Sequence, residues 1–235
     1  MDNNLLYVPL ERIKCRRPVD RLKFLQNAVA GKTVLDLGCL DETAYNTKRD
    51  TEFWLHGAIS KTAKKIIGID SSSLLDEHKD GLKPFYNSVI YKGNVFDLDE
   101  IINSYSDIDV VIAGELIEHL NNPMEFLDKI KSYSGLKGKT LILTTPNACS
   151  MSNIILGLFY RESTHEDHVN IFSYKTLNTI CKKTKMKSWD IIPYYSAYTE
   201  MIENSRGIKK LVTIIFEKLT NVLQFCFPLL GGGIL

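Results

Sequence analysis

Short apolar runs bounded by polar residues and glycine recur along the first two-thirds of the chain. The first, 33–38, combines β-branched and aliphatic residues and ends in glycine, which is typical of a strand buried on both faces of a parallel sheet. Similar runs follow at 65–70, 88–91, 109–113 and 140–145. A segment with helical spacing, 20–30, precedes the first run, and others, such as 52–64 and 123–132, lie between the runs. This alternation predicts right-handed βαβ units and a doubly wound α/β sheet.

The last third of the chain has a different pattern. Residues 173–183 predict a helix capped by Ser173, and 188–195 predict a strand. In 208–227, apolar residues recur at helical spacing with lysines between them, which predicts an amphipathic helix. Such a helix fits either a cover over the sheet or peripheral contact with a membrane surface. The stretch 219–235 contains proline and three glycines and is too short to span a bilayer.

Composition is that of an ordinary globular protein. The chain has 235 residues, 44% hydrophobic and 24% charged, without repeats or a flexible linker, and we expect a single domain over 1–235. A net charge of +1 provides no general attraction for nucleic acid. The five scattered cysteines are typical of reduced thiols, and Met1–Asn4 shows no signal-peptide start, so we expect a cytoplasmic protein.

The turn after the first predicted strand restricts the ligand. In the run Gly38-Cys39-Leu40-Asp41-Glu42-Thr43 only the first glycine of a dinucleotide fingerprint is present, which disfavours NAD and FAD. Asp41 and Glu42 would repel a pyrophosphate at the following helix. S-adenosylmethionine (SAM) carries a sulfonium and an ammonium group and no phosphate, so this site favours SAM.

Polar residues follow the next two predicted strands. Asp70 ends the second and can accept hydrogen bonds from vicinal ribose hydroxyls. Asn94 and Val95 follow the third and can contact the adenine edge. Asp36, Asp70 and Asn94 are each compatible with a capping role, but their occurrence at three successive strand ends favours a nucleoside site.

On these motifs the chain resembles the class I SAM-dependent methyltransferases, and among them the ubiquinone-biosynthesis O-methyltransferase group. The matching segments cover about 30–190; they are 34–39, 67–70, 93–95, 109–120, 144–147 and 168–173. Two positions depart from the pattern: Leu40 stands where a second glycine is usual, and Asn94 replaces the commoner aspartate.

The resemblance implies a Rossmann-like, seven-stranded, mostly parallel sheet with helices on both faces and a reversed last strand. It implies a SAM-binding core over about 30–190, with 1–29, 150–166 and 195–235 as acceptor-side or covering elements. The implied cofactor-binding residues are Asp36, Gly38, Cys39, Asp70, Ser71, Asn94, Val95 and Glu115.

Three chemically active side chains follow the fourth predicted strand. With a helix beginning at Leu116, the spacing places Glu115, Glu118 and His119 on one face. Together with His168 they resemble the metal site of small-RNA 2′-O-methyltransferases, and suit Mg²⁺, Mn²⁺, Fe²⁺ or Zn²⁺. Without a metal, His119 or His168 is the expected general base, and Glu115 is the third candidate catalytic residue. Alternatively, Glu115 lines the SAM pocket, Glu118 is solvated and His119 belongs to the core.

These observations predict a SAM-dependent methyltransferase that methylates a hydroxyl of a small molecule, glycan or lipid-linked sugar. The alternatives are an RNA 2′-O-methyltransferase, and a non-catalytic SAM-binding or interaction module, which Leu40 keeps open. Apolar and aromatic residues at 151–160 and 194–198 are compatible with an acceptor cleft, with core packing or with a homodimer surface.

Overall fold

The computed structural model describes residues 5–40 and 42–235, without the side chains of 42–44. The expectations for Met1–Asn4, for Asp41 and for the Glu42 side chain therefore lie outside the described residues. The contacts divide the chain into two compact units, Leu22–Thr144 and Met1–Arg21 with Thr145–Leu235. Each unit is described by itself, and the single domain over 1–235 stays a prediction.

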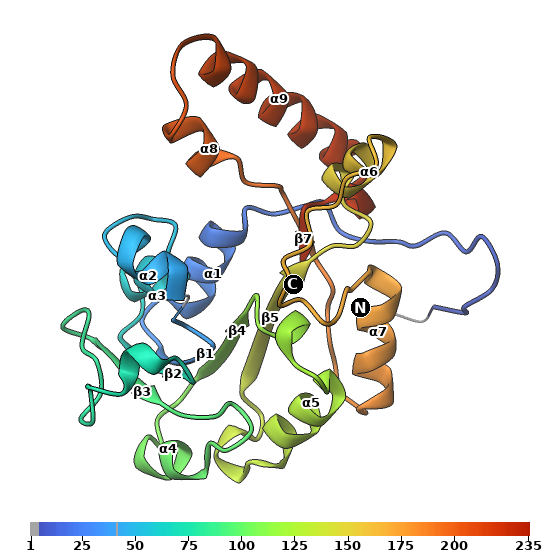
Figure 1. The fold of residues 1–235 in the computed structure, drawn as a ribbon. Coiled ribbons are helices and arrows are strands. Elements are labelled where there is room, and N and C mark those ends of the chain that lie inside the picture. The colour runs from blue at the N-terminus through green and yellow to red at the C-terminus, as the bar shows by residue number, and fades with distance from the viewer. Residues whose placement is uncertain (1–4, 41) are drawn as a thin grey trace. The chain divides into compact units, whose positions relative to one another are not determined.

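The Leu22–Thr144 unit is built on parallel strands. They are β1 (Thr33–Leu37), β2 (Lys65–Asp70), β3 (Ser88–Lys92), β4 (Val110–Gly114) and the start of β5 (Thr140–Pro146). Their order is β3-β2-β1-β4-β5 (Figure 1). All five apolar runs therefore form the expected strands, within one or two residues at each end. Every residue of β1 is buried, which explains why its sequence does not alternate.

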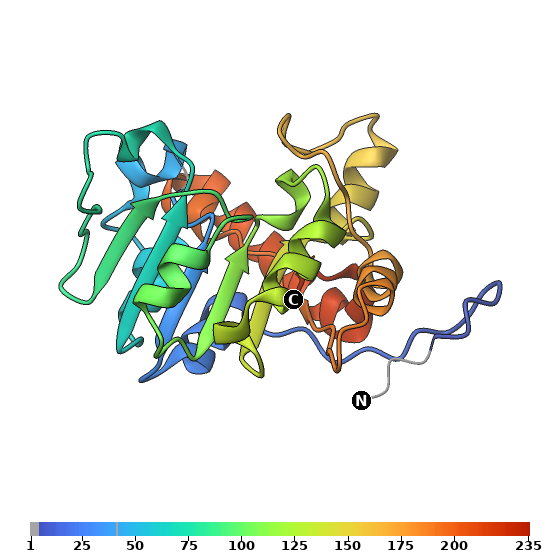
Figure 2. The same cartoon turned by 90° about the horizontal axis from the view of Figure 1, so that it is seen from below.

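Helices cover both faces of these strands. They are α1 (Arg21–Val29), α2 (Glu42–Lys48), α3 (Leu55–Ser60), α4 (Asp99–Ser104) and α5 (Pro123–Ser132), with short 3₁₀ turns η1 (Ser73–Leu75), η2 (Ile117–His119) and η3 (Ser134–Leu136). Leu25 and Val29 of α1 and Ile59 of α3 pack in one cluster with residues of β1, β2 and β4. The green helices α4 and α5 lie over the opposite face (Figure 2).

Capping and core contacts set the helix limits. Asn122 Oδ1 accepts from Glu125 N at 3.1 Å at the start of α5, and Pro123 occupies the first turn, so this helix matches its prediction. The helix expected at 52–64 is shorter. Trp54 has an extended backbone and its indole nitrogen donates to Cys39 O at 2.8 Å, so α3 begins only at Leu55.

In the second unit, β6 (Pro193–Tyr194) and β7 (Gly233–Ile234) form an antiparallel pair, and β7 pairs antiparallel with the last two residues of β5. The complete order is β3-β2-β1-β4-β5-β7-β6 in a seven-stranded sheet. This confirms the Rossmann-like fold and its reversed last strand. The strand expected at 188–195 shortens to two residues because β7, its ladder partner, is equally short.

The helices of the second unit are α6 (Met151–Leu158), α7 (Tyr174–Lys183), α8 (Thr199–Glu203) and α9 (Gly207–Cys226), followed by the 3₁₀ turn η4 (Pro228–Leu230). Ser173 caps α7 as predicted, and with Thr176 it forms a capping box. The predicted amphipathic helix is α9, and α8 and α9 stand between β6 and β7 in the chain. Among the described residues, no helix is long and apolar enough to cross a membrane.

Gly68, in the middle of β2, is required by close packing. A Cβ built there lies 2.5 Å from Cys39 Sγ and 2.9 Å from Ile90 Cγ1. We expect Gly68→Ala to lower the free energy of unfolding by about 2 kcal/mol, since two buried side chains have to move. Urea denaturation followed by circular dichroism measures this.

The matched control is Gly157→Ala in α6, where an added Cβ meets nothing within 4 Å. Helix propensity predicts an unchanged or higher stability there, by up to about 1 kcal/mol. Equal effects of the two substitutions would contradict the packing assigned to Gly68.

Candidate active site

The predicted cofactor residues gather at one edge of the parallel strands. β1 pairs with β2 and with β4 in register, Leu37 opposite Ile69 and opposite Ala113. The strands therefore end together, and the segments that follow them lie at the same edge. The structure places at or beside this edge Asp36, Gly38, Cys39, Asp70, Ser71, Asn94, Val95 and Glu115.

The turn after β1 depends on Gly38. Its φ is 67°, in the region that favours glycine, and its N–H donates to Ile69 O at 2.9 Å. A Cβ at this position would lie 2.7 Å from Leu116 Cδ1. Cys39 and Leu40 then enter the core, with 7% and 3% of their surface exposed. Leu40, the departure from the family pattern, is thus accommodated as a core residue.

The carboxylate of Asp70 joins two turns at this edge. Its Oδ2 accepts from Leu40 N at 2.8 Å, and its Oδ1 accepts from Ser72 N at 2.9 Å. The side chain is buried, with 9% of the residue exposed. An ionised carboxylate can accept about four hydrogen bonds, so Asp70 can keep these two backbone donors and also accept from hydroxyl groups of a ligand.

The residues after β2 and β3 differ in exposure. Ser71 and Asn94 are exposed, whereas Val95 is buried, with 9% of its surface exposed. Asn94 Oδ1 accepts from Phe96 N at 3.0 Å, so this side chain forms the turn after β3. The capping role considered for Asn94 is therefore present, and its contact with adenine stays a prediction.

Asp36 has a partner that the sequence did not indicate. His56 Nδ1 lies 2.8 Å from Asp36 Oδ2, and His56 Nε2 lies 2.6 Å from Ser88 Oγ. All three residues are buried. The only sequence signal was a histidine within the otherwise apolar start of α3, and nothing local connected it to β1 or β3. Asp36 is thus anchored in the core beneath the turn, and its contact with SAM stays a prediction.

The segment after β4 differs from its prediction. Instead of a helix beginning at Leu116, it forms the single 3₁₀ turn η2. Glu115 has a φ of 52°, strained for this residue type, and its N–H donates to Thr144 O at 2.8 Å. Glu118 is 1% exposed, whereas His119 is exposed. The two alternatives of a solvated Glu118 and a core His119 are therefore wrong.

His168 belongs to the other unit, where it is half-buried in the segment between α6 and α7. Its part in a metal site with Glu118 and His119 stays a prediction.

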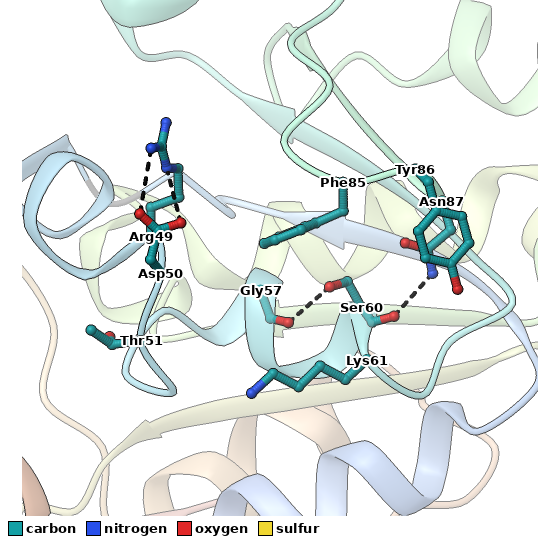
Figure 3. Close-up of a pocket in the computed structure, with 9 residues that line it drawn as sticks. All are labelled: Arg49, Asp50, Thr51, Gly57, Ser60, Lys61, Phe85, Tyr86 and Asn87. Atoms are coloured by element: carbon teal, nitrogen blue, oxygen red, sulfur yellow. Dashed lines mark hydrogen bonds and ion pairs between the residues drawn. The ribbon is translucent and has the colours of Figure 1, made fainter.

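A pocket of about 490 Å³ lies elsewhere in the Leu22–Thr144 unit (Figure 3). Its lining residues are Arg49, Asp50, Thr51, Gly57, Ser60, Lys61, Phe85, Tyr86 and Asn87. Asn87 directly precedes β3, and its Nδ2 donates to Ser60 O at 2.9 Å. The pocket therefore lies at the amino end of β3, away from the edge that carries the predicted cofactor residues.

Comparison with known proteins identifies the family. A family model described as a methyltransferase domain matches residues 11–186. The chain belongs to the methyltransferases. No curated protein matches the sequence. With the sheet order of the SAM-dependent methyltransferases, the chain is a SAM-dependent methyltransferase.

Solved structures of similar fold include the small RNA methyltransferase HEN1, with a TM-score of 0.52 and 19% identity. The match covers 81% of this methyltransferase but only 25% of the HEN1 chain. A SAM-dependent methyltransferase from Aquifex aeolicus has a TM-score of 0.45 and 12% identity, covering 74% of this chain and 84% of that one. At 19% identity the likeness to HEN1 shows the fold alone.

We expect His56→Ala to lower the free energy of unfolding of the methyltransferase by about 3 kcal/mol, because it leaves the Asp36 carboxylate buried without its partner. The exposed His78 is the matched control, and His78→Ala should change stability by less than about 0.5 kcal/mol. Denaturant titration of both variants measures the difference. Similar stabilities would contradict the role assigned to His56.

The cysteines of the methyltransferase should differ in reactivity. Burial, with a contribution from the charges of Asp36 and Asp70, raises the pKa of the Cys39 thiol well above its ordinary value. Burial likewise raises the pKa of Cys181 to about 11. The thiolate is the reactive form.

At mildly alkaline pH we therefore expect iodoacetamide to modify the exposed Cys149 and Cys226, and to modify Cys39 and Cys181 only after unfolding. Peptide mass spectrometry of native and denatured samples tests this. Rapid modification of Cys39 in the folded methyltransferase would show that the turn after β1 is open.

Proposed function

We propose that this methyltransferase transfers the methyl group of SAM to a hydroxyl oxygen of a small molecule, a glycan or a lipid-linked sugar. The observation that carries the proposal is the position of Asp70, a buried carboxylate at the carboxyl edge that fixes the turns after β1 and β2. An acceptor group at this location suits the vicinal hydroxyls of a ribose.

The residues present fit SAM. Gly38 permits the tight turn after β1 by its positive φ, and Asp70 is acceptor-only when ionised. The proposed cofactor-binding set is Asp36, Gly38, Cys39, Asp70, Ser71, Asn94, Val95 and Glu115. When bound, SAM supplies a methyl group already activated by the sulfonium. The chain therefore has to position the acceptor, exclude water and remove a proton.

His119 is the proposed general base. It is exposed on the turn after β4, while the adjacent Glu118 is buried. An imidazole can take the proton of an acceptor hydroxyl as the oxygen becomes bonded to the methyl carbon. We assign to Glu115 the role of orienting the acceptor. His168 is the second candidate for the general base. Oxygen as the acceptor atom is supported by the likeness of Glu115–His119 to the ubiquinone-pathway O-methyltransferases.

A divalent metal is the alternative to a histidine base. The proposed ligands are the carboxylates of Glu115 and Glu118 and the imidazoles of His119 and His168, residue types that suit Mg²⁺, Mn²⁺, Fe²⁺ or Zn²⁺. A metal there would supply Lewis acidity toward the acceptor hydroxyl. Metal analysis of the purified protein distinguishes a metal-dependent mechanism from one that uses a histidine base alone.

RNA is the second candidate acceptor, because HEN1 is a small RNA methyltransferase and has the same fold. A ribose 2′-hydroxyl is also an oxygen acceptor. The net charge of +1 counts against it, since phosphate contacts supply most of the affinity for nucleic acid. Acceptor assays therefore include short RNA beside sugars and phenols.

We expect Asp70→Ala to weaken SAM binding by at least about ten-fold in calorimetry, because the proposed hydrogen bonds from the ribose hydroxyls to the Asp70 carboxylate are lost. Asp76→Ala is the matched control, since Asp76 is an exposed acidic side chain that pairs with Lys92. Circular dichroism verifies that both variants fold.

An S-adenosylhomocysteine analogue without the ribose 2′-hydroxyl tests the same contact in the unaltered protein. It should bind more weakly than S-adenosylhomocysteine. Equal affinities, together with an unchanged affinity in a folded Asp70→Ala variant, would exclude the ribose contact.

We expect His119→Gln to lower kcat for methyl transfer by about 100-fold or more, with SAM affinity unchanged, because only proton removal is affected. The measurement is release of S-adenosylhomocysteine with a panel of hydroxyl acceptors. His78→Gln is the control, since His78 is exposed in the segment between η1 and β3. Full activity of His119→Gln would rule out both a His119 base and a metal held by His119.

A further inference from the structure

The α9 helix turns its polar side inward and its apolar side outward. Its buried residues are Thr213, Thr220 and Gln224, all polar. Six aliphatic residues on the other side are exposed: Ile208 81%, Leu211 58%, Val212 57%, Ile215 49%, Leu219 60% and Val222 61%. A surface helix of a globular protein ordinarily has the reverse arrangement.

Specific contacts hold α9 in this orientation. Gln224 Nε2 donates to Ser196 Oγ at 2.7 Å, and Ser196 N donates to Gln224 Oε1 at 3.0 Å. Farther along the helix, Tyr198 N donates to Glu217 Oε1 at 3.3 Å. The polar face is therefore bonded to the segment between β6 and α8, which belongs to the same unit (Figure 1).

The outward residues form one continuous surface. Ile208, Leu211, Ile215, Leu219 and Val222 follow one another at intervals of three and four, so they lie along one face of the helix. Single exposed aliphatic residues are ordinary, but a contiguous apolar strip marks an interaction surface. We call these five residues together with Val212 the α9 strip.

Two lysines stand at the edges of the α9 strip. Lys218 lies on one side of it, and Lys209 stands three residues before Val212 on the other, whereas the adjacent Lys210 projects about 100° from Lys209 and away from the strip. No ion pair joins Lys209, Lys210, Arg206 or Lys218 to any residue in the described part of the chain. Glu217 is the one acidic residue of α9, and it is bonded to Tyr198. The neighbouring α8 carries Glu200 and Glu203.

Lys218 distinguishes between two kinds of partner. It is exposed and stands three residues after Ile215 and four before Val222, beside the strip itself. Against the strip of a second copy, its ammonium would be desolvated, which is costly without an anion. On a bilayer, the aliphatic stem can lie along the apolar surface while the ammonium reaches the phosphates of the headgroups.

We propose that the α9 strip docks the protein on the surface of an anionic phospholipid bilayer. The helix lies in the plane of the membrane, so that the strip residues share one depth at the headgroup and acyl boundary, with Lys209 and Lys218 at the phosphates. At 20 residues α9 is about 30 Å long. This docking is independent of the proposed methyl transfer.

The test is flotation of the full-length protein with vesicles of phosphatidylcholine alone, and of phosphatidylcholine with an equal amount of phosphatidylglycerol. We expect binding to the anionic vesicles and little to the neutral ones. A variant with Leu211→Ser, Ile215→Ser and Leu219→Ser should bind roughly 100-fold more weakly. Lys218→Gln should weaken binding roughly five-fold.

The matched control replaces exposed apolar residues of the other unit, Leu74→Ser with Tyr86→Ser, and should bind like the unaltered protein. The serine variants alter only exposed side chains, and circular dichroism and SAM calorimetry on the same samples report folding and the methyltransferase site separately. Failure to float with anionic vesicles would overturn the proposal, as would full binding by the triple variant. A lipid-free dimer that the triple variant converts to monomer, without vesicle binding, would assign the strip to a second copy instead.

Discussion

The carboxylate of Asp70 fixes the geometry on which the candidate site depends. Its two oxygens accept from Leu40 N and Ser72 N, so one buried carboxylate joins the turns after both β1 and β2. Gly38 permits the first of these turns by its positive φ. Because parallel strands end at one edge, groups that follow different strands then face a common ligand. Both oxygens of this buried carboxylate therefore have a backbone hydrogen-bond donor.

The fold was predictable from sequence because its main signal is local. In the sequence, each buried parallel strand is a continuous apolar run, and β1 and β2 lie where that pattern predicts them. The short β7 gave no such signal, since Gly233–Ile234 pairs over only two residues in each ladder. The contact of His56 with Asp36 was equally hidden, because it joins positions 20 residues apart through packing that no local pattern encodes.

Two segments show where periodicity was insufficient. Spacing predicted a helix after β4 that would align Glu115, Glu118 and His119, but Glu115 takes a positive φ and only a 3₁₀ turn follows. The amphipathicity of α9 was plain in the sequence, yet spacing cannot tell which face is inward. The hydrogen bonds between Gln224 and Ser196 hold the polar face inward, so the apolar face is outward. Polar contacts thus decide the orientation where the hydrophobic pattern alone would favour the opposite one.

The central claim is that SAM occupies the carboxyl edge of the parallel strands through Asp70. A crystal structure of the methyltransferase with S-adenosylhomocysteine tests it most directly. The account predicts the ribose hydroxyls within hydrogen-bond distance of the Asp70 carboxylate, with the Leu40 and Ser72 N–H bonds retained. A nucleoside bound elsewhere, such as in the pocket beside α3, or at the edge without contact to Asp70, would contradict it.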